Sequence, residues 1–373
     1  MGALSFFLIA GEPSGDRLGA ALMAGLKALH PDVSFQGVGG PLMQAEGLDS
    51  LFPMEELAIM GLVEVLPKYL PLKRRIRQTA QAALAASPDA MITIDSPDFC
   101  LRVADLVKAG RRDLRIIHYV APSVWAWRPG RAAKMARVID HVLTLLPFEP
   151  PYMTAAGMTA DFVGHPVVAE PLGMADALPG SWPLILMLPG SRRGEVRRLA
   201  PVFGAVLGDL LRVHPGLRVA LPTVRGVEGD VRALTADWPV RPEIITDAAR
   251  KRDAFAAADV AVAASGTVSL ELAANACPMV VAYKMNPLSF WLMRRAARVD
   301  TVTLVNLISQ TRVVPEFLGP KCQPGPIAAA VLDALAHPDA QNAAMEATMT
   351  LLGRGGEAPG LRAARSVLGA IGR

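Results

Sequence analysis

The sequence lacks a disulfide framework and any regular spacing of metal ligands. Its three cysteines, Cys100, Cys277 and Cys322, lie far apart in a chain of 373 residues, and their number is odd. Disulfide-rich domains and structural zinc sites carry several cysteines at short spacings. We therefore expect a protein of a reducing compartment that has no metal site.

Long apolar runs are missing too. No run reaches the roughly 18 residues that a membrane-spanning helix needs, and the run from Leu4 to Ala10 is too short for a signal peptide. These absences predict a cytoplasmic protein whose contact with a membrane, if it has one, is peripheral.

Aromatic residues and excess charge are scarce. Aromatics make up 5% of the chain, and the formal net charge is only +4. Proteins that bind single-stranded nucleic acid combine basic grooves with aromatic stacking surfaces. The composition therefore argues against a nucleic-acid partner.

What the chain does have is apolar residues, at 52%, and enough length for about two domains. Residues 258–284 show the recurring pattern: a strand from Asp259 to Ala264, a small-residue turn at 265–267, a helix, and the strand Met279 to Tyr283. Such a turn suits a phosphate, because free N–H groups and the helix dipole meet there. Glu271, one turn into the helix, could accept hydrogen bonds from a ribose, although an ordinary capped helix explains this stretch alone more simply.

The first half begins with a strand at Leu4–Ala10, and the spacing Gly11-x-x-x-Gly15 in its loop differs from the GxGxxG dinucleotide fingerprint. Asp16 or Ser14 is expected to cap a helix that starts at Arg17. A further strand ends at Asp95, and ligands bind at the carboxyl ends of strands in open α/β sheets. Asp95 is therefore a candidate general base.

Two loops and one expected strand add further candidates. The loop 121–130 carries Trp125 and Trp127 beside Arg128, which suits a ligand wall, although packing on a helix remains an alternative. After a linker at 167–182, the turn 189–195 brings Arg192 and Arg193 to a helix start, where they could clamp phosphates. Residues 301–306 are expected to form a strand that ends at Asn306, near the turn at 265–267.

The segment 54–77 joins apolar residues to a basic cluster at 73–77. It suits either an interfacial contact with anionic lipid or a core helix with a solvated basic end, and taken alone it favours the core helix. The whole pattern predicts an α/β protein of two Rossmann-like, doubly wound domains that face each other across a cleft. We expect domains at 1–166 and 183–345, with a C-terminal helix at 346–373 that could pack back on the first domain.

Several long motifs, in order along the chain, resemble the lipid A disaccharide synthase family, inverting glycosyltransferases with two Rossmann domains (the GT-B type). They are Ala10-Gly-Glu-Pro-Ser-Gly-Asp16, Met54-Glu-Glu-Leu-Ala-Ile-Met-Gly61, Ile94-Asp-Ser-Pro-Asp-Phe99, His118-Tyr-Val-Ala-Pro-Ser-Val-Trp-Ala-Trp-Arg128, Leu188-Pro-Gly-Ser-Arg192, Ala264-Ser-Gly-Thr267 and Val305-Asn-Leu307. Ser309-Gln-Thr-Arg312 departs from the family pattern, so no role is transferred to it.

The resemblance implies that UDP-2,3-diacylglucosamine donates its sugar to 2,3-diacylglucosamine 1-phosphate, without metal or cofactor, at the cytoplasmic face of the inner membrane. The alternative is another GT-B enzyme that uses a donor of the UDP-N-acetylglucosamine type. A homodimer is left open as the oligomeric state.

The resemblance also implies roles for individual residues. Asp95 is expected to be the catalytic base. Donor binding is expected at Ser14, Arg192, Ser265, Gly266, Thr267, Glu271 and Asn306. With acylated substrates, the interfacial interpretation of segment 54–77 becomes the favoured one. Contact with the acceptor, its acyl chains or the membrane is expected at Met60, Leu62, Val63, Leu66, Leu70, Arg74 and Arg75.

Overall fold

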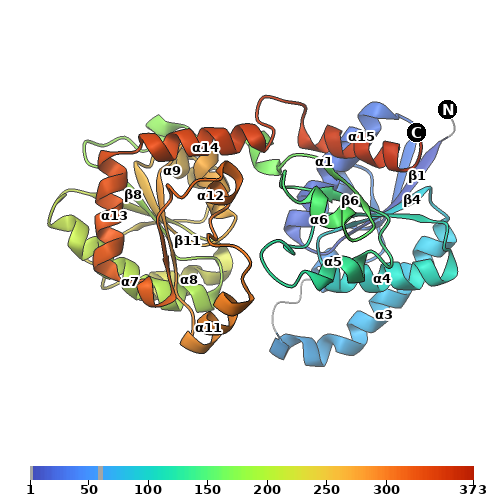
Figure 1. The fold of residues 1–373 in the computed structure, drawn as a ribbon, viewed down its shortest axis with the longest axis horizontal. Helices are drawn as coiled ribbons and strands as arrows, with labels where there is room; N and C mark the ends of the chain where they lie inside the picture. The colour runs from blue at the N-terminus through green and yellow to red at the C-terminus, as the bar shows by residue number, and fades with distance from the viewer. Residues whose placement is uncertain (1–2, 58–61) are drawn as a thin grey trace. The chain divides into compact units, whose positions relative to one another are not determined.

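The computed structural model describes residues 3–57 and 62–373, and for residues 62–69, 287 and 288 it describes the backbone alone. The chain divides into two compact units. Unit 1 comprises Met1–Ala169 and Gly355–Arg373, and unit 2 comprises Glu170–Arg354. Figure 1 shows the ribbon of both units and labels many of their helices and strands.

Unit 1 is built on a seven-stranded parallel sheet in the order β3-β2-β1-β4-β5-β6-β7. Its strands are β1 (Leu4–Ala10), β2 (Val33–Val38), β3 (Asp49–Ser50), β4 (Ala90–Ile94), β5 (Arg115–Tyr119), β6 (His141–Thr144) and β7 (Thr159–Phe162). The central strands β1 and β4 are almost wholly apolar and buried, because helices cover both faces of the sheet.

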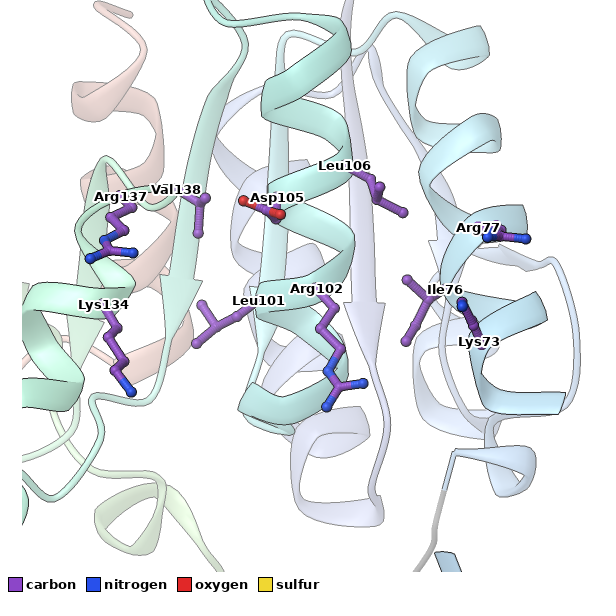
Figure 2. Close-up of a pocket in the computed structure, with 10 residues that line it drawn as sticks. All are labelled: Lys73, Ile76, Arg77, Leu101, Arg102, Asp105, Leu106, Lys134, Arg137 and Val138. Carbon is purple, nitrogen blue, oxygen red and sulfur yellow. The ribbon is translucent and has the colours of Figure 1, made fainter. Parts of the chain in front are cut away.

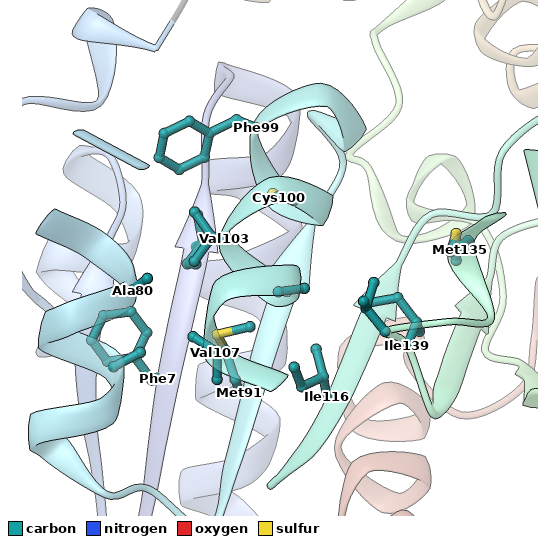
Figure 3. Packing of buried hydrophobic residues seen from close by; sticks show 14 of the residues in the cluster. Phe7, Ala80, Met91, Phe99, Cys100, Val103, Val107, Ile116, Met135 and Ile139 are labelled. Carbon is teal, nitrogen blue, oxygen red and sulfur yellow. The ribbon is translucent and has the colours of Figure 1, made fainter. Parts of the chain in front are cut away.

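The helices of unit 1 form two layers. They are α1 (Pro13–Leu29), α2 (Pro41–Ala45), α3 (Leu62–Ala86), α4 (Pro97–Gly110), α5 (Gly130–Met135), α6 (Pro150–Thr154) and α15 (Pro359–Ala370), with short 3-10 turns at Met54–Glu56 and Pro166–Ala169. Side chains of α3, α4 and α5 pack with Phe7, Met91 and Ile116 on one face of the sheet (Figure 3). Helices α1 and α15 pack on the other face.

Helix α15 brings the end of the chain back to unit 1, where it lies along α1 (Figure 1). The two helices approach so closely that only glycine fits at two places. A Cβ on Gly25 would lie 2.5 Å from the carbonyl oxygen of Gly360, and a Cβ on Gly360 would lie 2.5 Å from that of Ala21. The expected single helix at 346–373 is therefore wrong in detail, because its first residues belong to the end of α14 (Asp339–Leu351) in unit 2.

Unit 2 repeats the architecture with a six-stranded parallel sheet in the order β10-β9-β8-β11-β12-β13. Its strands are β8 (Leu184–Leu188), β9 (Arg218–Pro222), β10 (Glu243–Ile245), β11 (Val260–Ala264), β12 (Met279–Tyr283) and β13 (Glu316–Leu318). Its helices are α7 (Arg193–Leu211), α8 (Glu228–Leu234), α9 (Ala248–Ala257), α10 (Val268–Ala274), α11 (Pro287–Ala296), α12 (Leu304–Ser309), α13 (Pro324–Ala336) and α14, with 3-10 turns at Ala175–Ala177, Arg225–Val227 and Gly319–Lys321.

Both units are doubly wound α/β folds, so the predicted fold class is confirmed. Within the described ranges, no helix combines the length and the apolar character needed to cross a bilayer. In each sheet the strand order reverses beside the first strand of the unit, between β1 and β4 in unit 1 and between β8 and β11 in unit 2. Such reversals leave a crevice at the carboxyl ends of the strands, where ligands bind in this class of fold.

Candidate active site

The reversal in unit 1 brings together two loops that the sequence singles out. The loop after β1 begins at Gly11, and the loop after β4 consists of Asp95 and Ser96. They are in close contact, since a Cβ on Gly11 would lie 2.7 Å from the Ser96 hydroxyl oxygen. Glycine at position 11 thus allows the backbone of the first loop to reach the second.

Asp95 is held in an unusual backbone conformation. Its φ is +51° and that of Ser96 is +42°, so two consecutive residues other than glycine lie in the left-handed region. Each such residue costs on the order of 1–3 kcal/mol and persists where its surroundings fix it, which is typical of functional sites. The Asp95 N–H donates to the Tyr119 carbonyl at 3.0 Å, and its side chain is half-buried. A carboxylate carried on a strained backbone at this edge of the sheet suits the role of general base that is expected for Asp95.

Helix α1 begins at Pro13, not at the expected Arg17, and Ser14 lies exposed in its first turn. The expectation that Asp16 or Ser14 caps this helix is wrong, because the N-cap is Glu12. Asp16 is buried and accepts hydrogen bonds, each 3.0 Å long, from the backbone N–H groups of Gly40, Leu42 and Met43. Asp16 therefore anchors the start of α2, whereas the Ser14 side chain is exposed at the start of α1.

The tryptophan loop follows β5, the neighbour of β4. The loop is bounded by two strained residues, Val120 with φ +84° and Arg128 with φ +51°. Trp125 donates its indole N–H to Glu149 at 3.1 Å and meets Phe148 edge to face, with ring centroids 5.1 Å apart. The loop is thus anchored on the turn after β6, which supports the packing alternative for Trp125.

Trp127 is left partly open, with 38% of its surface exposed, and the Arg128 guanidinium lies 4.2 Å from its ring centre. The exposed ring of Trp127 is therefore the part of the loop that still fits the interpretation as a ligand wall.

Glu149 is the residue of this site that sequence reasoning missed. Burial raises its pKa to about 7, although the N–H groups of Leu146 and Trp125 donate to its two oxygens and favour the charged form. The only signal in the sequence was an acid between Phe148 and Pro150, immediately after a strand.

The reversal in unit 2 brings the loop at 189–192 beside the turn at 265–267. Gly190 has φ +107°, and a Cβ there would collide with the Glu195 carboxylate. Arg192 stands at the N-cap of α7 with 72% of its side chain exposed, 3.2 Å from Glu195. Arg193 pairs with Asp230, also at 3.2 Å, and 70% of its side chain is exposed. Both guanidinium groups at this turn are thus exposed and ion-paired, and Arg192 is the one at the N-cap position.

The second turn of unit 2 leads into α10. Gly266 and Thr267 are exposed, Ser265 is half-buried, and a Cβ on Gly266 would meet nothing within 4 Å. The Glu271 carboxylate lies in the first turn of α10, 2.6 Å from the ammonium of Lys251 on α9. The turn is thus open to a ligand, and the carboxylate is held by a neighbouring cation.

Asn306 does not occupy the expected strand end. Residues 304–309 form α12, because the Glu316 carboxylate, not a neighbouring strand, accepts the N–H groups of Val302 and Thr303. Asn306 is 1% exposed, and its amide bonds to both backbone groups of Val314 and to the Thr301 hydroxyl. Its side chain holds this loop together, so the expected direct contact with the donor is not supported.

The structure does not describe the side chains of some residues that are expected to contact the acceptor or the membrane. Met60 falls among the residues that are not described, and only the backbone is described for Leu62, Val63 and Leu66. Within α3, Leu70 is 76% exposed and Arg74 is exposed. Arg75 is held inside the unit: its guanidinium pairs with Glu56 at 2.6 Å, donates to Gln78 at 2.7 Å and stacks on Phe52 at 4.4 Å. The expectation that Arg75 is free to contact a membrane is therefore not supported.

Three comparisons with known proteins are informative. The family model of lipid-A-disaccharide synthetase matches residues 6–358. The lipid-A-disaccharide synthase of Ruegeria pomeroyi is 62% identical over 97% of this chain and 94% of its own, and that of Rhodospirillum centenum is 47% identical over 100% and 96%.

Solved structures agree in fold at low identity. A putative UDP-N-acetylglucosamine 2-epimerase from Listeria monocytogenes is 14% identical with a TM-score of 0.66, covering 99% of this chain and 96% of its own. A calicheamicin glycosyltransferase is 16% identical with a TM-score of 0.63, covering 100% and 99%. The chain belongs to the lipid-A-disaccharide synthase family.

Proposed function

We propose that this glycosyltransferase moves the sugar of UDP-2,3-diacylglucosamine to the 6-hydroxyl of 2,3-diacylglucosamine 1-phosphate. The products are UDP and a β-1,6-linked lipid A disaccharide 1-phosphate. Family membership supports the reaction. The observation that carries the assignment of residues is that the loops at both strand reversals hold groups suited to this chemistry.

Asp95 of unit 1 is the proposed general base. In a single displacement, the acceptor 6-oxygen bonds to the anomeric carbon while the bond from that carbon to UDP breaks, and the configuration inverts. The proton of the acceptor hydroxyl passes to the Asp95 carboxylate as the new bond forms. The strained backbone at Asp95 and Ser96 fixes the direction of this carboxylate before substrate binds.

Unit 2 supplies the proposed donor site. The leaving UDP gains negative charge, which the open guanidinium of Arg192 and the N–H groups of the turn at Ser265, Gly266 and Thr267 stabilise. Glu271 accepts the ribose hydroxyls, and its ion pair with Lys251 holds the carboxylate in place. Ser14 is the proposed donor contact from unit 1. No step of this proposal requires a metal or a cofactor.

The acylated substrates place the enzyme at a membrane surface in this proposal. Peripheral contact with the cytoplasmic face of the inner membrane is supported by the exposed Leu70 and Arg74 on α3. Residues Met60, Leu62, Val63 and Leu66 remain proposed contacts for the same surface or for acyl chains.

The test of the base is Asp95→Asn, which keeps the shape of the side chain but cannot take the proton. We expect kcat to fall by about 10²–10⁴-fold while the affinity for UDP stays unchanged, measured by product formation and by calorimetry. Asp98→Asn is the matched control, because Asp98 is an exposed acid on the following helix.

A kcat for Asp95→Asn close to that of the unaltered enzyme would remove Asp95 from the role of base. The same assay with unacylated UDP-N-acetylglucosamine addresses the alternative donor. Efficient turnover of that donor would favour a different GT-B reaction.

A further inference from the structure

Arg128 differs from the other cations of unit 1 in its position. It belongs to the tryptophan loop, which links β5 to α5. Among the loops that directly follow the strands of unit 1, as far as the structure describes them, only this one contains an arginine or a lysine. His165, in the loop after β7, adds no charge at neutral pH, because burial lowers its pKa to about 4. Arg128 therefore carries the permanent positive charge of the described loops at this edge of the sheet.

The tryptophan loop starts beside the proposed base. Strands β4 and β5 pair in register up to Ile94 and Tyr119, and the Asp95 N–H then donates to the Tyr119 carbonyl at 3.0 Å. The two chain segments therefore leave the sheet side by side. One carries Asp95, and the other continues into the loop at Val120. A sugar that is bound against Asp95 is thus next to the tryptophan loop.

Contacts along the loop hold it in one conformation. Val124 is 2% exposed, and the indole N–H of Trp125 donates to Glu149 at 3.1 Å. The Arg131 N–H donates to the Arg128 carbonyl at 3.1 Å. Arg128 itself has φ +51°, a left-handed value that a residue other than glycine keeps where its surroundings fix it. The position of Arg128 is therefore set before a substrate binds.

The Arg128 guanidinium is oriented but not neutralised. It is exposed and lies 4.2 Å from the centre of the Trp127 ring. A guanidinium stacked on a ring uses its flat face, so the N–H groups along its edge remain available. Within the described ranges no carboxylate pairs with it, whereas Arg111, which precedes the same strand, pairs with Asp113 at 3.5 Å. Such an edge of N–H donors suits a phosphate, which accepts two parallel hydrogen bonds.

The proposed acceptor carries a group of this kind. Its reacting 6-hydroxyl and its 1-phosphate are attached on either side of the ring oxygen, so one sugar ring separates the base from the phosphate site. We propose that Arg128 binds the 1-phosphate of the acceptor, with the Trp127 ring holding the guanidinium in place. This inference rests on the proposed function, because the phosphate belongs to the proposed acceptor. It makes Arg128 the residue that selects a phosphorylated sugar over an unphosphorylated one.

The test compares two acceptors, 2,3-diacylglucosamine 1-phosphate and 2,3-diacylglucosamine. The donor is UDP-2,3-diacylglucosamine, and all substrates are held in neutral detergent micelles. The measured quantity is the phosphate preference, which is the ratio of kcat/KM for the phosphorylated acceptor to kcat/KM for the unphosphorylated one. The test variant is Arg128→Gln, and circular dichroism confirms that each variant is folded.

The matched control is Arg137→Gln, which removes the same charge from another exposed arginine of unit 1. Arg137 follows α5, the helix that begins just after the tryptophan loop. Figure 2 shows it farther than Lys134 from the end of the unit at which the strands finish. The control therefore changes the charge of unit 1 away from the proposed phosphate site.

We expect the unaltered enzyme to prefer the phosphorylated acceptor by roughly 10–100-fold, since hydrogen bonds to charged groups are the stronger ones. Arg128→Gln should remove most of this preference by lowering kcat/KM for the phosphorylated acceptor alone, and calorimetry should show an unchanged affinity for UDP. Arg128→Lys keeps the charge but lacks the fork of donors, so it should retain part of the preference. Arg137→Gln should retain all of it.

Equal loss of kcat/KM for both acceptors in Arg128→Gln would overturn the proposal, because it would show that the side chain only shapes the loop. A phosphate preference that survives in this variant would overturn it too, as would an unaltered enzyme that uses both acceptors equally well. Failure of the proposed function gives a different result. The unaltered enzyme would then form no product from the phosphorylated acceptor, and both proposals would be wrong.

Discussion

Glu149 illustrates, at the scale of a single residue, a carboxyl group that burial holds in its neutral form near neutral pH. Its pKa is raised to about 7, whereas in the unfolded chain it titrates near 4.5. Between these values the folded protein binds one more proton than the unfolded chain does. Stability from this group is therefore fully present below about pH 4.5, falls as the pH rises toward 7, and is gone above that.

The variant Glu149→Gln tests this. It removes the titration, so the free energy of unfolding of the unaltered protein should fall relative to that of the variant by about 2.5 kcal/mol between pH 5 and pH 8. Urea denaturation at the two pH values measures the difference. Burial lowers the pKa of His118 and of His165 to about 4, which has the opposite effect on the pH dependence of stability. Both histidines are present in both proteins, so their contribution cancels in the comparison. Parallel pH profiles for the two proteins would contradict the prediction.

Residues differ in how far the sequence predicts them. Asp95 and Arg192 could be placed because each follows an apolar strand, and the ends of parallel strands share one edge of the sheet. Asp16, Asn306 and Glu149 could not, because their partners are set by tertiary packing. The Asp16 carboxylate, for example, bonds to N–H groups more than twenty residues away in sequence.

At the scale of elements, apolar strands and amphipathic helices were predictable, and the failures have a common cause. Residues 301–306 have the β-branched composition of a strand, but Glu316 binds the N–H groups that a neighbouring strand would need. The local sequence pattern also could not predict that α15 packs against α1. This contact depends on glycines that are far apart in sequence and meet where the two helices cross.

This crossing gives a prediction with an internal control. Gly360→Ala places a methyl group about 2.5 Å from the Ala21 carbonyl oxygen and should destabilise unit 1 by about 1–3 kcal/mol. Gly369→Ala, in the same helix, meets nothing within 4 Å and should be neutral or stabilising by up to about 1 kcal/mol. Thermal denaturation followed by circular dichroism compares the two variants. Equal melting temperatures would show that α15 shifts easily on α1.

At the scale of the molecule, the two units each have their own sheet and their own core. Unit 2 is one continuous stretch of chain, whereas unit 1 needs the returning residues 355–373 to cover one face of its sheet. Sequence pattern predicted two α/β domains because each repeats the alternation of strand and helix. It did not fix where the last helices belong, since an amphipathic helix such as α15 can cover any apolar face of suitable shape.

Because unit 2 is continuous and has its own core, residues 170–354 should fold alone and bind UDP. Every proposed contact with UDP except Ser14 lies in this fragment, so its dissociation constant should be within about tenfold of that of the whole chain, which corresponds to about 1.4 kcal/mol. Calorimetry measures the affinity after circular dichroism has shown that the fragment is folded. In both contexts Glu271→Gln should weaken UDP binding by roughly tenfold or more, because hydrogen bonds to a charged carboxylate are worth about 1.5–3 kcal/mol. A folded fragment with no affinity for UDP would place essential donor contacts in unit 1, and the division of labour between a donor-binding unit and a base-bearing unit would then be wrong.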